Sequence, residues 1–302
     1  MSIHVNEENL VFHLRTPKTS YIMAVAKGKY LCHVYWGDRL NKEPDLNNGL
    51  ILRNICFSAN TENEDKSYSL DYACQEYPTG CNTDFRIPAI SMEFNDGSRV
   101  LELKYDGYEL IKGKQKLTGL PATYVEEESE ADTINIILRD TVKSIKVILQ
   151  YTAYNSLDVI TRNVKVVNES GEPVRIDRIM SMNVDFEDSG YDMIELSGAW
   201  GRERHIERTP LRSGIQAIES RRGASSHQLN PFFALADKNA DESTGRVYGF
   251  NFVFSGNFTA GAEVDQLFKT RVFMGINDYD FSWLLEAGEE FRIADSEGTL
   301  LY

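Results

Sequence analysis

Polar and apolar residues alternate with a period of two along several stretches of this chain. Residues 145–153 carry apolar side chains at every second position, namely Ile145, Val147, Leu149, Tyr151 and Ala153. Residues 174–186 repeat the pattern over most of their length, 248–254 repeat it with aromatic side chains, and 101–105 form a shorter run. Because neighbouring side chains of a strand point to opposite faces, this period predicts strands with one face on a core.

Turn residues separate these runs at short intervals. Asn95-Asp96-Gly97 and Asp106-Gly107 tolerate the positive φ angles of tight hairpins, and residues 168–173 read as a plain connection. No sustained helical period is present. We therefore predict an all-β fold, a large antiparallel sandwich, with irregular segments at 41–60 and 197–231.

Composition excludes some partners. The 302 residues hold 32 Lys and Arg against 46 Asp and Glu, a formal charge of −14, and 42% are hydrophobic. The hydrophobic content is that of a folded protein, and the negative net charge repels the phosphates of nucleic acids and lipid headgroups. We therefore expect no nucleic-acid partner and no membrane partner. The first residues do not resemble a secretory signal, and we expect a cytoplasmic protein.

Chemical motifs are scarce. The four cysteines, at 32, 56, 74 and 81, match no zinc or redox spacing, so we predict free thiols and no metal site. No nucleophile elbow, dinucleotide motif or phosphate loop occurs. From the residues alone we predict no catalytic constellation and no cofactor.

Two strings in residues 197–232 are unusually rich in polar groups. The first, 200–208, suggests a sugar-binding or interface loop with an aromatic platform, or else an ion-paired network that fixes a long loop. The second, 221–232, places serine beside histidine, but adjacency does not make a catalytic dyad, and a packed loop whose Ser and Asn side chains satisfy backbone groups explains it better. The residues considered for an interface or a sugar are Trp36, Trp200, Arg202, Glu203, His205, Arg222, Ser225 and His227. Trp283 is predicted to lie in the core.

The same strings carry a family resemblance. Gly-Ala-Trp-Gly-Arg-Glu-Arg at 198–204 and Arg-Arg-Gly-Ala-Ser-Ser-His-Gln at 221–228 resemble the N-terminal domain of bacterial α-galactosidases, glycoside hydrolase family 36. His-Val-Tyr-Trp-Gly at 33–37, Gln-Glu-Tyr-Pro at 75–78 and Asp-Phe-Arg-Ile-Pro-Ala at 84–89 are similar as well. The resemblance runs from near residue 10 to about Phe291.

The resemblance implies a β-supersandwich of the galactose-mutarotase type over residues 1–291. In the family a (β/α)₈ barrel follows and carries both catalytic aspartates, and a barrel needs about 250 residues. The resemblance thus implies that this chain lacks the barrel, and residues 292–302, which depart from the family pattern, are expected to be a divergent C-terminal tail.

The function implied is that of a non-catalytic domain serving assembly, barrel packing and the pocket edge of an enzyme that hydrolyses terminal α-galactosides such as melibiose and raffinose. The chain alone is expected to be inactive, with a barrel or further copies of itself as partner. An exposed apolar patch and self-association are expected where a barrel would pack.

In tetrameric family members, an Asp and an Arg of an N-terminal loop border a neighbour's pocket. The matching positions here are Asn54 and Lys66, so neither identity is kept, and Lys cannot reproduce the planar fork of Arg. Two alternatives stay open at this point. One is a carbohydrate-binding module that presents Trp36 or Trp200 to a glycan, and the other is an aldose epimerase that uses His205 or His227 as its acid.

Overall fold

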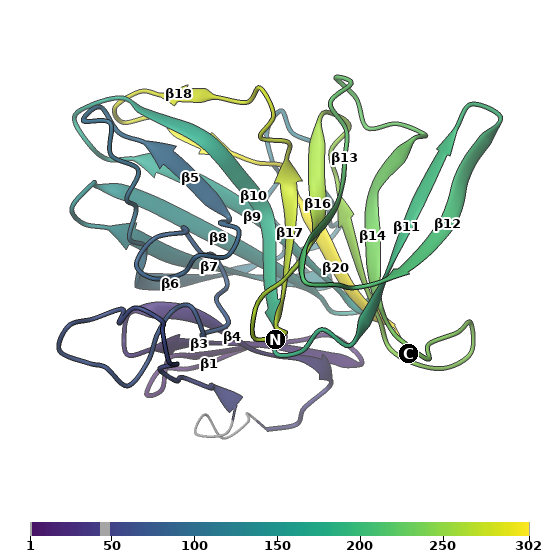
Figure 1. The fold of residues 1–302 in the computed structure, drawn as a ribbon, viewed down its shortest axis with the longest axis horizontal. Coiled ribbons are helices and arrows are strands. Elements are labelled where there is room, and N and C mark those ends of the chain that lie inside the picture. Colours follow the sequence, from purple (N-terminus) through teal and green to yellow (C-terminus); the bar gives the residue numbers. More distant parts are fainter. Residues whose placement is uncertain (1, 43–48, 302) are drawn as a thin grey trace.

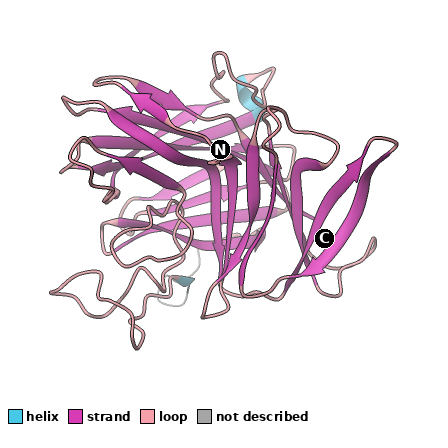
Figure 2. Ribbon diagram, turned by 45° about the horizontal axis from the view of Figure 1, so that its top comes forward, coloured by secondary structure: helices cyan, strands magenta, loops and turns pink. Residues whose placement is uncertain are grey.

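The computed structural model describes residues 2–42 and 49–301 as antiparallel strands arranged in three sheets (Figure 1). A four-stranded sheet near the N-terminus has the order β1 (Ile3–Asn6), β2 (Val11–Arg15), β3 (Thr19–Ala26) and β4 (Tyr30–Asp38). A short 3₁₀ turn, η1, spans Glu128–Glu130. Figure 2 shows how fully strands dominate the described chain. The predicted all-β sandwich is confirmed.

The second sheet has six strands. Its order is β13 (Gly214–Glu219), β16 (Phe258–Val264), β17 (Thr270–Ile276), β10 (Val174–Phe186) and β18 (Trp283–Leu285), with β5 (Ile90–Glu93) also paired to β10.

The third sheet has ten strands. Its order is β12 (Arg202–Pro210), β11 (Tyr191–Ala199), β14 (Leu229–Asp237), β15 (Val247–Phe252), β20 (Ser296–Leu301), β9 (Val159–Asn168), β8 (Ile145–Tyr154), β7 (Ala131–Asp140) and β6 (Lys104–Lys112), with β19 (Glu290–Arg292) on β9.

One large hydrophobic core lies between the sheets. It joins alternate side chains of β8 to those of β10 and to the phenylalanines of β15, so the three longer alternating runs each supply an inward face. The shortest run behaves differently. Leu101 and Leu103 are buried but precede β6, because the Glu102 amide donates to the Asp140 carboxylate at 2.7 Å instead of pairing in a ladder.

The prediction of an irregular segment at 197–231 is wrong. The end of β11, all of β12 and β13, and the start of β14 lie in it. Strand β12 pairs only with β11 and is exposed along its whole length, so neither of its faces meets a core and no alternation marks it. The β11–β12 hairpin extends at the right of Figure 1, away from the other strands. Of the other segment, 41–60, residues 43–48 lie outside the described residues.

Residue 291 does not divide the fold. Strand β20, in the expected tail, lies between β15 and β9 in the ten-stranded sheet. Trp36 packs directly on its Gly298, where a Cβ atom would come within 2.8 Å of the indole ring. Asp295 is fully buried and pairs with Lys114 at 2.8 Å. The residues after 291 are therefore part of the sandwich.

Candidate functional site

A segment without strands, residues 49–67, carries the two residues matched to a pocket edge. We call it the arm. The Asn54 side-chain amide donates to the Lys66 carbonyl at 3.1 Å and to the Asn60 side chain at 2.8 Å, and both Asn54 and Lys66 are exposed. Beside them Phe57 is fully exposed. The structure thus brings Asn54 and Lys66 together on one surface.

The arm folds back on residues 68–73, which we call the root. The Ser69 amide donates to the Arg53 carbonyl at 2.9 Å, next to Asn54, and the Ser58 hydroxyl donates to Asp71 at 3.1 Å. The root itself is largely buried, with Tyr68, Leu70 and Ala73 in a small hydrophobic cluster beside β4. The arm therefore has a fixed base on the sandwich.

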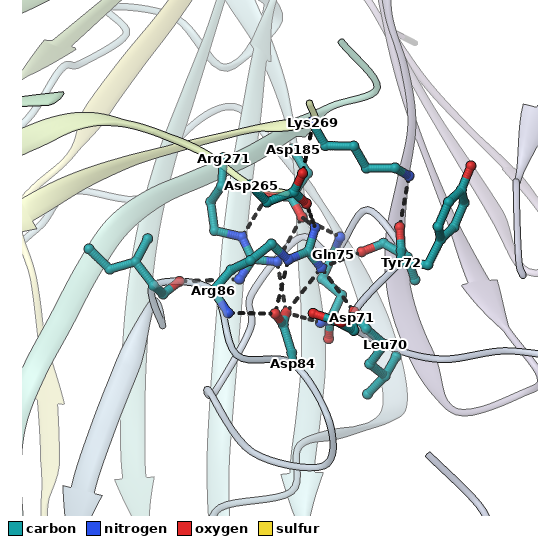
Figure 3. A network of polar contacts seen from close by, with 12 residues as sticks. Leu70, Asp71, Tyr72, Gln75, Asp84, Arg86, Asp185, Asp265, Lys269 and Arg271 are labelled. Atoms are coloured by element: carbon teal, nitrogen blue, oxygen red, sulfur yellow. Dashed lines mark hydrogen bonds and ion pairs between the residues drawn. The ribbon is translucent and has the colours of Figure 1, made fainter. Parts of the chain in front are cut away.

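Behind the root lies a buried ion network, Asp84, Arg86, Asp185 and Arg271, which we call the anchor (Figure 3). Arg271 of β17 donates to Asp84 and to Asp185 of β10, each at 2.8 Å, and Arg86 pairs with Asp84 at 2.9 Å. Burial opposes ionisation of Asp185, but Arg271 and Arg86 outweigh it and lower its pKa to about 2. Each charge in the anchor is thereby compensated.

A second buried cluster surrounds Glu76. Its carboxylate accepts hydrogen bonds from Tyr21 at 2.7 Å, Tyr151 at 2.7 Å and Arg162 at 2.9 Å, and contacts His33 Nδ1 at 2.8 Å. Burial disfavours the charged form, yet Arg162 and His33 prevail and the pKa of Glu76 lies below its usual value. The glutamate and histidine of this cluster are 0% and 7% exposed, so they cannot contact a sugar from solvent.

The polar strings at 200–208 and 221–232 come together around the tip of the β11–β12 hairpin. Trp200 is 93% exposed, and Arg202, Glu203 and His205 are exposed beside it. The Gly198 amide donates to the Gln228 carbonyl at 3.0 Å, which joins the second string to the first. The pKa of Glu203 is lowered, chiefly by the Gly201 amide and further by His227.

The three candidate residues of the second string are Arg222, Ser225 and His227. Ser225 is held by its amide, which donates to the Ser255 carbonyl at 2.8 Å, and Arg222 and His227 are exposed. Ser225 and His227 are joined by no hydrogen bond among the described residues. The Ser226 hydroxyl bonds to Gln228 instead of to His227.

The tryptophans depart from expectation. Trp36 is 6% exposed and packs among Tyr21, Tyr248 and Phe250, so it presents no face to a glycan. Trp283 is 48% exposed and its ring lies 5.1 Å from that of Phe291 at the sheet edge, so its predicted core position is wrong. Only a partner-covered or solvent-facing role is left for Trp283.

A surface cavity of about 560 Å³ opens beside the β11–β12 hairpin. Ile194, Ile206, Ala236 and Val247 form its apolar wall, and Arg208 lies on its rim. The guanidinium of Arg208 is already engaged by Asp192 at 2.8 Å and by carbonyls of 237–240. Asp241, Glu242 and Ser243 complete the lining, so the hollow combines an apolar wall with a polar rim.

Other chemistry finds little support in the described residues. Within 2–42 and 49–301, no group of three or more His, Cys, Asp or Glu side chains could hold a metal ion. All four cysteines are free thiols, with Cys56 exposed. Among the described residues, no helix is both long enough and apolar enough to cross a membrane.

Sequence reasoning missed the anchor as a unit. Asp84 and Arg86 stood within a string quoted for its resemblance, but their partners Asp185 and Arg271 are far away in the chain. The one local signal was a pair of opposite charges two residues apart. That pattern alone does not distinguish a surface pair from a buried one.

Comparison with known proteins finds relatives of this chain in one glycosidase family. The model of the glycosyl hydrolase family 36 N-terminal domain matches residues 29–286. α-Galactosidase AgaA of Geobacillus stearothermophilus is 51% identical over 294 residues, and Mel36A of Lactobacillus acidophilus is 37% identical over 297. The crystal structure of the family 36 α-galactosidase AgaB of G. stearothermophilus superposes with a TM-score of 0.96 at 50% identity over 100% of this chain and 41% of its own.

These matches cover 97% and 96% of this chain with AgaA and Mel36A respectively, but 40% of each relative. The chain therefore spans about two fifths of the length of the α-galactosidases that it matches. The resemblance seen in the sequence is confirmed: the chain belongs to glycoside hydrolase family 36, as its N-terminal domain.

Proposed function

We propose that this chain serves as the non-catalytic N-terminal domain of an α-galactosidase, where it supports assembly, packs against a catalytic barrel and borders the substrate pocket. The observation that carries the proposal is the full-length match to the N-terminal two fifths of such enzymes. Structures of the relative AgaA with raffinose and with stachyose suggest α-galactosides as the substrate class. The epimerase and binding-module alternatives gain no support from these relatives.

Within this function, the arm is the proposed pocket edge. Asn54 and Lys66 lie on one exposed surface, and both can donate to sugar hydroxyls. Lys66 supplies a point charge, whereas the Arg implied by the family supplies a planar fork. We therefore propose weaker orientation of the sugar by this chain than by a member that keeps Arg.

The first test measures activity of the purified 302-residue chain. We expect p-nitrophenol release from p-nitrophenyl α-galactoside at the rate of buffer, because the resemblance assigns both catalytic aspartates to the barrel. Clear, enzyme-dependent release would overturn the proposal. Reading the coding sequence beyond codon 302, or that of its neighbours, should reveal a (β/α)₈ barrel.

The second test joins this chain to the catalytic remainder of AgaA. The chimera should hydrolyse raffinose, and Lys66→Arg should lower KM several-fold with kcat nearly unchanged, because the fork binds sugar hydroxyls without touching the reacting bond. A matched change on a distant surface, Lys165→Arg, is the control. Equal KM values in all three chimeras would remove Lys66 from the pocket edge.

Location and assembly complete the proposal. We propose a cytoplasmic protein that forms homo-oligomers, supported by the four free thiols and by the exposed apolar side chains on the hairpin and arm. Cell fractionation tests the first point, and sedimentation, described below, tests the second.

A further inference from the structure

The backbone hydrogen bonds of the root stay within it or go to the arm. Besides its apolar packing, the root is held on the sandwich by side chains that reach its carbonyl oxygens. Arg86 donates through Nη2 to the Leu70 carbonyl at 2.9 Å and to the Ala73 carbonyl at 2.8 Å. Lys269 donates to the Tyr72 carbonyl between them at 2.7 Å. Three of four consecutive carbonyls are thus held by two buried cations.

Arg86 is itself fixed by the central sandwich strands, and Lys269 directly precedes β17. Arg86 pairs with Asp84, which Arg271 of β17 holds at 2.8 Å, and Arg271 also bonds Asp185 of β10 (Figure 3). Asp185 accepts the Gln75 amide at 3.0 Å, just past the root. The contacts therefore run without a break from β10 and β17 to the root.

From the root, the contacts continue to the arm. Asp71 accepts the Ser58 hydroxyl, the Ser69 amide holds the Arg53 carbonyl, and the Leu70 amide donates to the Thr61 hydroxyl at 2.9 Å. Asn54 follows Arg53 directly. A displacement of the root carbonyls would therefore move the surface that carries Asn54 and Lys66.

We propose that the anchor, together with Lys269, is a positioning device that holds the arm, and with it Asn54 and Lys66, in the orientation needed at the pocket edge. The inference rests on the proposed pocket-edge function, but it concerns residues that touch no sugar. Arg86 and Lys269 act through the root backbone. Apolar packing of the root against β4 keeps the root near the sandwich, whereas the anchor fixes its carbonyls.

The test measures backbone amide exchange in the intact 302-residue chain, free of sugar and barrel. Arg86→Lys keeps a positive charge beside Asp84 but loses the guanidinium Nη2 that bonds two root carbonyls. Lys269→Met keeps the length of the side chain but loses the donor to the Tyr72 carbonyl. We expect exchange in peptides covering 51–67 to rise at least tenfold in both variants. Peptides of β7 to β9 should exchange as in the parent.

Matched controls separate this from a general loss of stability. Arg139→Lys and Lys165→Met alter exposed ion pairs of the same chemistry and should leave the arm unchanged. A nitroxide on Cys56, in a Cys81→Ser background, gives a second signal. Its mobile spectral fraction should at least double in Arg86→Lys. Should Arg86→Lys fail to fold, Lys269→Met and Ser58→Ala carry the test.

Unchanged arm exchange in the folded variants would overturn the proposal, and so would an arm that already exchanges at the rate of a free peptide in the parent. Because no sugar is present, this result is independent of the KM test on Lys66. The KM test can fail while amide exchange still shows that the anchor holds the arm, and the reverse, so the two failures are distinguishable.

Discussion

Single residues place several full charges in the interior, and their partners decide whether this is tolerated. Glu76 is the clearest case, since its carboxylate has no exposed surface and four side chains contact it. Because a buried ion is expensive to desolvate, removing one of its partners leaves an uncompensated charge and should lower the stability strongly.

Glu76→Gln should lower the free energy of unfolding by about 3–5 kcal/mol, because Arg162 would keep a buried charge without compensation. Urea unfolding followed by fluorescence measures the change. Glu290→Gln, which breaks an exposed pair with Lys165, should cost under about 1 kcal/mol. Similar losses in the two variants would show that the cluster is not an energetic unit.

His13 predicts a pH dependence. Burial, then Arg15, His4 and Arg39, lower its pKa from 6.5 to about 4. The folded protein keeps His13 neutral, while the unfolded chain takes up a proton near pH 6.5. The stability that depends on neutral His13 is therefore full above pH 6.5 and is lost as the pH falls toward 4.

Between pH 7 and 5, the parent should lose on the order of 1 kcal/mol more than His13→Gln, after allowance for solvent screening. Denaturation midpoints at the two pH values measure the difference. An equal pH response of both proteins would contradict the assignment.

At the scale of elements, the last described strand occupies a central position in the largest sheet although it lies near the end of the sequence. Strand β20 bridges β15 and β9, and the adjoining Asp295 accepts hydrogen bonds from Thr123 while it pairs with Lys114. Its removal would open two ladders at the middle of the largest sheet.

A chain that stops after residue 292 should therefore fail to form the sandwich. Circular dichroism and size exclusion should show an aggregated or unfolded product. The milder variant Asp295→Asn should fold but lose about 3–5 kcal/mol, because Lys114 then lacks a counter-charge. A cooperative, fully folded 1–292 protein would mean that the sheet closes without β20.

The sequence predicted those strands that have one face on the core and the other face toward more polar surroundings. The alternating runs of β8, β10 and β15 each face one core, and their period follows directly from that. It did not reveal β12, which faces no core, or β20, whose interior place depends on pairing with strands far along the chain.

The candidate site divides in the same way. Asn54 and Lys66 could be found because the family resemblance marks their positions. The anchor could not, since Arg271 and Asp84 are 187 residues apart and only the folded sheets bring them within 2.8 Å. Local patterns cannot report contacts of that range.

At the scale of the whole molecule, two surface properties oppose each other. The net charge of −14 keeps copies apart, whereas Phe57, Trp200, Ile206 and Leu284 expose large apolar side chains. Repulsion between exposed charges is screened by salt, but apolar contact is not.

We therefore expect association that rises with salt. Sedimentation velocity at about 0.05 M and about 0.5 M NaCl, where the screening length falls severalfold, should show a larger species in the second. Trp200→Ser with Ile206→Ser should reduce it without loss of stability, since both side chains are exposed. A monomer under all conditions would contradict an uncovered interface.

The central place of β20 also bears on how the protein is made. The ribosome delivers residues 296–301 last among the described strands, yet strands β9 and β15, which they join, emerge long before. Until then the nascent chain exposes two unpaired strand edges in the middle of its largest sheet, a form prone to aggregate. Slow, late closure of this kind favours chaperone contact during synthesis, and expression at lower temperature should raise the soluble yield.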